Sequence, residues 1–103
     1  APLFTQVENQ PMASRALLEK VIGGQYKKEN VVLAHTLIGL TYSYENQYKM
    51  ANRYYDEALK TDESYFPAIV NSGFAYLATE QYPEAARLLS QATQLQQNNV
   101  IPY

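Results

Sequence analysis

The chain has 103 residues, the length of one ordinary domain, with 47% hydrophobic and 17% charged residues and a net charge of −2. This composition argues against intrinsic disorder and against nucleic acid as a partner, which would call for a basic surface. The chain has no cysteine, which excludes disulfides and thiol chemistry, and no apolar run near the ~20 residues that cross a bilayer. We expect a soluble chain without membrane insertion, with a cytoplasmic location slightly favoured over a periplasmic or secreted one.

The first two helices are predicted at about Pro11–Ile22 and 31–44. Proline suits a first helical turn, and Gly23-Gly24 is a typical stop signal for the first helix. Asn30 is expected to be the N-cap of the second helix. In the first helix, apolar residues recur at helical spacing: Met12, Ala16, Leu17 and Val21.

Three further helices are predicted at about 48–60, 65–79 and 82–95. Lys60 lies in the last turn of the third helix, where the helix dipole favours a cation. The turn at 62–64 contains Asp and Ser, which are expected to cap the fourth helix. The last two helices carry proline in their opening turns, at Pro67 and Pro83. One apolar stripe of the third helix comprises Met50, Ala51, Tyr54, Tyr55, Ala58 and Leu59.

The linkers between these helices are only a few residues long, which forces neighbouring helices to fold back antiparallel. No run alternates between apolar and polar residues in the manner of a strand. The sequence therefore predicts an all-α fold of about five helices arranged as antiparallel hairpins.

A fixed spacing of 34 residues recurs between Ala34 and Ala92. A period of this length is typical of a stacked repeat, with two helices in each copy. Small residues in each copy are expected to lie opposite large ones, so that the helices interdigitate. The small residues are Gly39 and Ala51, then Gly73 and Ala85, and the large residues beside them are Ile38, Tyr42 and Tyr55, then Tyr76 and Leu89. The pairs in phase are Ala34/Ala68, Gly39/Gly73, Tyr42/Tyr76, Gln47/Gln81, Tyr48/Tyr82, Ala51/Ala85, Arg53/Arg87 and Ala58/Ala92.

These positions resemble the tetratricopeptide repeat, whose signature combines Leu-Gly, Tyr, Ala, an aromatic residue and Ala at these intervals. The resemblance covers two copies, at 32–65 and 66–99. It implies a short right-handed α-solenoid, and we expect 1–103 to form a single domain of this kind. The chain departs from the signature without breaking the helix pairing at His35, Ile38, Glu63, Ile69, Ser72 and Gln97.

The two ends of the chain do not form complete copies. Residues 1–30 match poorly, so their helix is either the second helix of a degenerate repeat or a separate capping helix. Residues 100–103 fall in phase with the start of a further repeat, and we expect the natural chain to continue past Tyr103. An unfinished end of a stack is also an expected place for self-association.

In tetratricopeptide proteins the first helix of each pair lines a concave groove, which the resemblance places on the helices at 31–44 and 65–79. Each of these two helices carries a second apolar stripe, and a helix that is apolar on two sides must be buried on both. We expect an apolar peptide or protein segment to bind there. The candidate groove residues are Leu33, Thr36, Leu37, Leu40, Tyr44, Val70, Asn71, Phe74 and Leu77.

Family members that bind an acidic C-terminal carboxylate place Lys, Arg and Asn in this groove. This chain has Thr36, Leu40 and Val70 at such places, and only Asn71 fits, so no carboxylate clamp is expected. The second stripe has three alternative occupants: residues 1–22 of the same chain, a protein partner, or a second copy in a homo-oligomer.

The sequence contains no constellation of residues that indicates catalysis, a cofactor or a metal. His35 is the only histidine, no cysteine accompanies it, and a zinc site needs three or four ligands. We therefore interpret His35 as a packing residue. Gly23-Gly24 lacks the Lys-Ser/Thr of a phosphate loop, and Ser43, Ser72 and Ser90 lack an evident base.

The leading hypothesis is a non-catalytic scaffold or adaptor that binds a protein or peptide in its groove. The alternative is a structural spacer or self-assembly module of a larger multi-protein machine. An RNA-binding helical repeat is disfavoured, because such repeats need polar code residues and a basic backbone path, and this chain is acidic.

Overall fold

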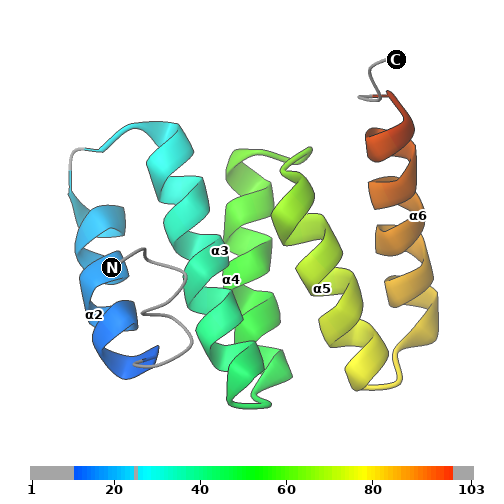
Figure 1. Ribbon diagram of the computed structural model, residues 1–103, viewed down its shortest axis with the longest axis horizontal. Coiled ribbons are helices and arrows are strands. Elements are labelled where there is room, and N and C mark those ends of the chain that lie inside the picture. The colour runs from blue at the N-terminus through cyan, green and yellow to red at the C-terminus, as the bar shows by residue number, and fades with distance from the viewer. Residues whose placement is uncertain (1–10, 25, 99–103) are drawn as a thin grey trace.

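The computed structural model describes residues 11–24 and 26–98, which form five helices and no strand (Figure 1). This confirms the all-α prediction. The helices are α2 (Pro11–Gly23), α3 (Lys28–Tyr44), α4 (Tyr48–Thr61), α5 (Phe66–Ala78) and α6 (Tyr82–Asn98).

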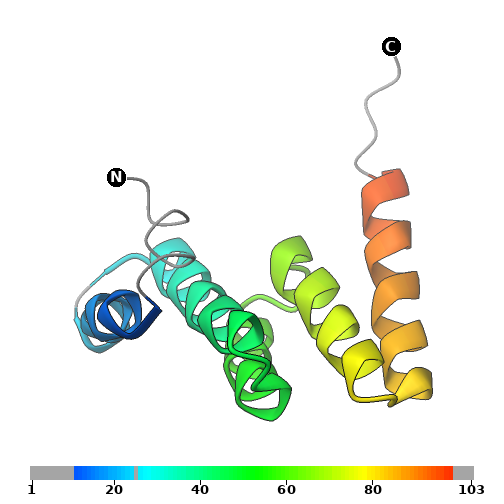
Figure 2. The same ribbon diagram turned by 60° about the horizontal axis from the view of Figure 1, so that its bottom comes forward.

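The helices pack in chain order, each against its neighbours in the sequence. The stack has α2 at one end and α6 at the other, and successive helices run in opposite directions (Figure 1). In the views of Figure 1 and Figure 2, α4 lies behind α3, so the helices do not form a single flat row. The contact between α3 and α5 is the one described contact that skips a helix. Each hairpin is therefore held both by its own two helices and by the hairpin beside it.

Two predicted helix ends are wrong, and both concern capping residues. Asn30 is not an N-cap, because α3 already begins at Lys28, after an extended Lys27 whose side chain makes no capping hydrogen bond. Asp62 and Ser64 do not cap α5 either, since its N-cap is Tyr65. Asp62 instead accepts a hydrogen bond from the backbone N–H of Ser64, at 3.1 Å, and so stabilises the turn before the helix.

The turn inside each hairpin is the same in both copies. Asn46 and Glu80 adopt left-handed backbone conformations, with φ of 61° and 63°. The backbone N–H of the next residue then donates a hydrogen bond to the preceding helix: Gln47 N–H to the Tyr42 carbonyl, and Gln81 N–H to the Tyr76 carbonyl. This arrangement satisfies carbonyls at the helix end and reverses the chain.

Glu80 is strained by this turn, because an L-residue with a β-carbon disfavours the left-handed region. Replacing Glu80 by glycine is expected to raise the free energy of unfolding by about 0.5–1 kcal/mol. Urea unfolding measures the change. The matched substitution Asn46→Gly should raise the free energy of unfolding by less. Asparagine tolerates this conformation, and Asn46 accepts a hydrogen bond from the Tyr48 hydroxyl at 3.0 Å that glycine would lose. A loss of stability in Glu80→Gly would contradict the assignment of strain.

The predicted pairing of small and large residues is confirmed at both glycines. A β-carbon added to Gly39 would lie 2.6 Å from Cδ1 of Tyr55, and one added to Gly73 would lie 2.8 Å from Cδ2 of Leu89. The two glycines therefore let the helices of each hairpin approach closely. The same 34-residue spacing that relates the glycines also relates Tyr55 to Leu89.

Alanine should be tolerated differently at the two glycines. Gly39→Ala is expected to lower the free energy of unfolding by about 1–3 kcal/mol, because the ring of Tyr55 is fully buried and has no room to shift. Gly73→Ala should be close to neutral, since half-buried Leu89 is flexible and alanine favours the helix. Parallel urea titrations of both variants make the comparison; equal losses would contradict it.

The core consists of a small apolar cluster between each pair of adjacent helices. Leu18 of α2 packs against α3, and Tyr55 of α4 packs against α5. Ile69 of α5 packs against α6. Ser72, one of the departures from the repeat signature, is buried and donates a hydrogen bond to Asn52 Oδ1 at 2.9 Å. That bond satisfies the buried hydroxyl between α4 and α5.

Candidate protein-binding face

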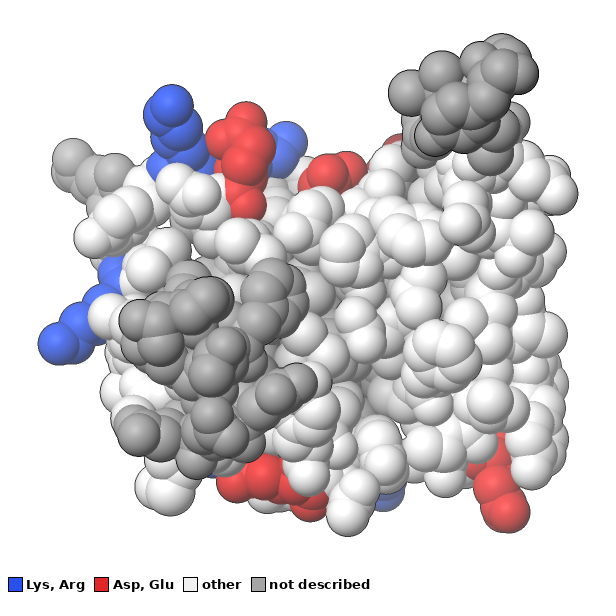
Figure 3. Space-filling view, viewed as in Figure 1, with Lys and Arg blue, Asp and Glu red and all other residues white. Residues whose placement is uncertain are grey.

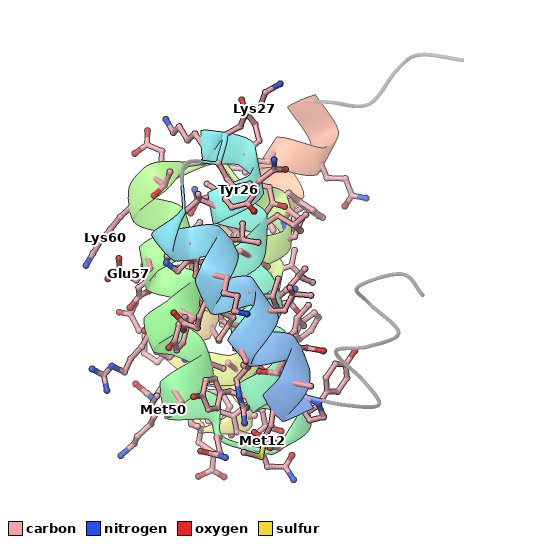
Figure 4. The ribbon with its side chains drawn as sticks, turned by 90° about the vertical axis from the view of Figure 1, so that its left-hand side faces the viewer. Met12, Tyr26, Lys27, Met50, Glu57 and Lys60 are labelled. Carbon is pink, nitrogen blue, oxygen red and sulfur yellow. The ribbon has the colours of Figure 1, made fainter. Side chains whose placement is uncertain are left out.

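The first helices of the two hairpins, α3 and α5, contact each other and carry the predicted groove residues. In Figure 1, α3 lies in front of α4, so the same view shows the α3 side of the molecule. Figure 3 shows that this side is almost free of charged side chains outside its grey atoms, with Lys, Arg, Asp and Glu gathered at its rims. The ion pair between Lys60 and Glu57 lies on the outer edge of α4, away from α3 (Figure 4).

Three of the predicted groove residues are large and exposed. Tyr44, Phe74 and Leu77 keep 54%, 55% and 44% of their surface accessible. In α5 the nearby residues Ser72 and Ala75 are buried. Phe74 and Leu77 are three residues apart, so they lie next to each other on the exposed side of α5.

Four predicted groove residues are half-buried, namely Leu33, Leu40, Val70 and Asn71. Leu33 and Leu40 pack against the cluster that joins α2 to α3, and Val70 packs against the cluster between α5 and α6. The Asn71 side chain donates a hydrogen bond to the Pro67 carbonyl at 2.7 Å. These four residues contribute part of their surface to the face and part to the core.

The remaining two predicted groove residues, Thr36 and Leu37, are fully buried. The Thr36 hydroxyl donates a hydrogen bond to the Val32 carbonyl at 3.0 Å. Leu37 packs in a cluster with Leu18 of α2 and Ala34. Of the three occupants considered for the second stripe, α2 therefore covers Leu37. Neither Thr36 nor Leu37 has surface left for a partner.

A cavity of about 180 Å³ lies between the end of α2 and the start of α3. Its mainly apolar lining includes Leu18, Leu33 and exposed Tyr26. Tyr26 and Lys27 lie at the loop that joins the two helices, whereas Met12 lies at the opposite end of α2 (Figure 4). No pattern in the sequence indicates this cavity, because it depends on how α2 packs against α3.

A polar network fixes the other end of α2. Arg15 donates hydrogen bonds to Thr41, at 3.3 Å, and to Glu45, at 2.5 Å, and its guanidinium carbon lies 4.2 Å from the Tyr42 ring centroid. Cation–π contact and ion pairing act together here. The Tyr42 ring stacks in turn on Tyr54, with centroids 5.6 Å apart. The network therefore joins three successive helices.

Two tyrosines of this region, Tyr54 and Tyr55, have raised pKa values. Burial raises the pKa of Tyr55 to about 12, and its hydroxyl shares a 2.9 Å hydrogen bond with Ser43. Burial also raises the pKa of Tyr54, assisted by the hydrogen bond that this phenol donates to Glu19 at 3.0 Å. Both groups contribute packing and hydrogen bonds rather than charge.

The lone histidine that the sequence singled out packs at a helix interface. His35 is half-buried, and its ring centroid lies 6.3 Å from that of Tyr54. Within 11–24 and 26–98, no three His, Asp or Glu side chains are grouped so as to hold a metal ion. The same residues include no helix with the length and hydropathy to span a membrane.

Comparison with known proteins identifies the repeat. A family model described as tetratricopeptide repeat matches residues 44–103, which is more than half of the chain and includes α4, α5 and α6. No curated protein and no solved structure matches the chain. Tetratricopeptide repeats generally act as protein–protein interaction modules and are typically non-catalytic. The matched residues and the two equivalent hairpins show that the chain belongs to the tetratricopeptide repeat family.

Proposed function

We propose that this chain is a non-catalytic interaction module that binds an apolar peptide or protein segment across α3 and α5. The observation that supports this most directly is the exposure of Tyr44, Phe74 and Leu77 on α3 and α5, two helices that contact each other. Large apolar side chains that remain exposed in a group mark an interaction surface more often than isolated ones do.

Binding would gain its free energy from removing these side chains from water. Full desolvation of one large apolar side chain is worth about 1.5–3 kcal/mol. Half-buried Leu40 and Val70 would add to the contact without moving, since their other sides already pack in the core. The face is therefore partly preformed, which reduces the entropy lost on binding.

The same residues disfavour an acidic C-terminal ligand. Thr36 is buried, and Leu40 and Val70 carry no charge. The Asn71 amide, the remaining group suited to a carboxylate, already donates to the Pro67 carbonyl. A carboxylate brought to this face would lose its hydration without a cationic partner.

The double substitution of Phe74 and Leu77 by glutamine tests this proposal. Peptides selected from a random 12-residue library against the purified chain should be apolar, and should bind the double variant at least about 30-fold more weakly. Fluorescence anisotropy with the selected peptides gives the affinities, and circular dichroism checks that the helices persist. An acidic C-terminal peptide serves as a second probe and should not bind.

Leu17→Gln is the matched control, because Leu17 is also an exposed leucine but lies on α2. It should leave the affinity unchanged. The proposal is wrong if the double variant keeps full affinity while its helicity is intact, or if the acidic peptide binds tightly in a salt-sensitive manner.

A further inference from the structure

The cavity between α2 and α3 has the form of a pocket that is open to solvent. Exposed Tyr26 and half-buried Val21 and Leu33 line it, and Tyr26 lies in the loop that joins the two helices (Figure 4). The rest of its apolar lining is almost fully buried, with 1% of the surface of each residue accessible: Leu18, Ala34 and Leu37. The exposed residues therefore form the edge of the cavity, and the buried ones form its base.

The volume and lining of the cavity restrict what it can hold. Its volume is about 180 Å³. Sites that enclose a whole small-molecule ligand have about 300–1,000 Å³, whereas an engineered apolar cavity of about 150 Å³ in another protein binds benzene. No residue of the lining is charged, so a charged group would lose its hydration there without a partner. The cavity is therefore suited to one apolar group of the size of a large side chain.

The cavity adjoins the face that α3 and α5 present. Leu33 lines the cavity and belongs to the same stripe of α3 as Leu40 and Tyr44 of that face. Tyr44 follows Leu33 by eleven residues, which is about 17 Å along a helix. An extended chain rises about 3.3 Å per residue, so about five of its residues cover this distance. A segment that contacts Tyr44 and runs along α3 can therefore reach the cavity.

From these observations we infer that the cavity holds one large apolar side chain, that of Phe, Leu or Met, from the segment that binds across α3 and α5. The inference rests on the proposed function and deepens it, because it specifies the residue by which the segment is anchored. The anchor lies about five residues from the part of the segment that contacts Tyr44. Side chains that fill such pockets contribute much of the affinity at protein interfaces.

Val21→Phe tests the anchor, because the added ring would occupy the cavity. The apolar peptides selected from the 12-residue library should bind this variant at least about tenfold more weakly than they bind the parent chain. Fluorescence anisotropy measures the affinities, and circular dichroism verifies that the helices persist. If the cavity were only a packing defect, filling it would leave the affinity unchanged, and that result in folded Val21→Phe would overturn the inference.

An alanine scan of the selected peptides tests whether the anchor and the cavity are coupled. One large apolar position of each peptide should lose at least about tenfold in affinity for the parent chain when it is replaced by alanine. The same replacement should cost less than about twofold with Val21→Phe, since the anchor no longer has a cavity to enter. Equal losses with both chains at every peptide position would contradict the inference.

Benzene is a probe of the cavity that does not depend on the α3 and α5 face. In nuclear magnetic resonance spectra of the full chain, saturating benzene should shift the methyl signals of Leu18, Val21 and Leu33. It should leave the signals of Leu18 and Leu33 unshifted in Val21→Phe. If these signals do not shift in the parent chain, the cavity does not accept a side chain and the inference is wrong.

Ile22→Phe is the matched control, because Ile22 is the neighbouring half-buried aliphatic residue of α2 and does not line the cavity. It should leave the peptide affinity unchanged, and an equal loss in this variant would overturn the inference. The two proposals fail separately. Loss of affinity in the Phe74 and Leu77 double variant but not in Val21→Phe would refute the anchor alone. Failure to select any peptide would refute both.

Discussion

Replacement of Tyr55 by alanine is expected to lower the free energy of unfolding by about 3–5 kcal/mol. The Tyr55 side chain is fully buried, fills the space above Gly39, and packs with Ala51 and Ala75 between α4 and α5. Its removal leaves a cavity among small residues that have no side chain to fill it. Domains of this size have a total stability of about 5–15 kcal/mol, so the variant should be partly unfolded at 37 °C. Urea unfolding followed by circular dichroism measures the loss.

Tyr55→Phe provides the control for this prediction. It keeps the ring and removes only the hydrogen bond with Ser43, so it should cost about 0.5–1.5 kcal/mol. If Tyr55→Ala cost no more than Tyr55→Phe, the ring would not be the main contact between the hairpins.

Leu18→Ala is expected to destabilise the contact of α2 with the rest of the stack by about 2–5 kcal/mol. Leu18 is the fully buried residue through which α2 packs against Ala34, Leu37 and Ile38 of α3. Because α2 is at the end of the stack, its contact with α3 should be lost before the other interhelical contacts are. Amide hydrogen exchange should show faster exchange in α2, with smaller changes in α5 and α6.

The neighbouring substitution Leu17→Ala is a matched control, since it removes the same atoms from a leucine that is largely exposed. It should change the exchange of α2 by less than about 0.5 kcal/mol. Uniform acceleration along the whole chain in Leu18→Ala would instead mean that the five helices unfold as one unit.

The fold was largely predictable because its determinants are local or periodic. Helix starts at Tyr48 and Tyr82 follow from the turn before them, and the 34-residue period pairs Gly39 with Gly73 as sites of close helix packing, which the structure bears out at both. The caps were not predictable in the same way. Asn30 has a good capping side chain, but α3 starts at Lys28, before it. Tertiary packing of the apolar residues that follow outweighs a capping preference of about 1 kcal/mol.

The candidate binding face was predictable only in part. Periodicity identifies the side of a helix on which Phe74 and Leu77 lie, and both are exposed. It does not show which residues a neighbouring helix covers, and α2 removes Leu37 from the surface. The contacts of Arg15 with Thr41 and Glu45 join residues 26 and 30 positions apart, outside the repeat, and no pattern in the sequence indicates them.

The chain-order packing of the five helices has a kinetic consequence. Since nearly every interhelical contact joins neighbours in the sequence, the chain has a low contact order, and little loop-closure entropy is lost before contacts form. Helical domains of this kind fold within microseconds to milliseconds. Folding can begin at any one hairpin and extend to its neighbours in either direction, so the chain can acquire structure while it is still emerging from the ribosome.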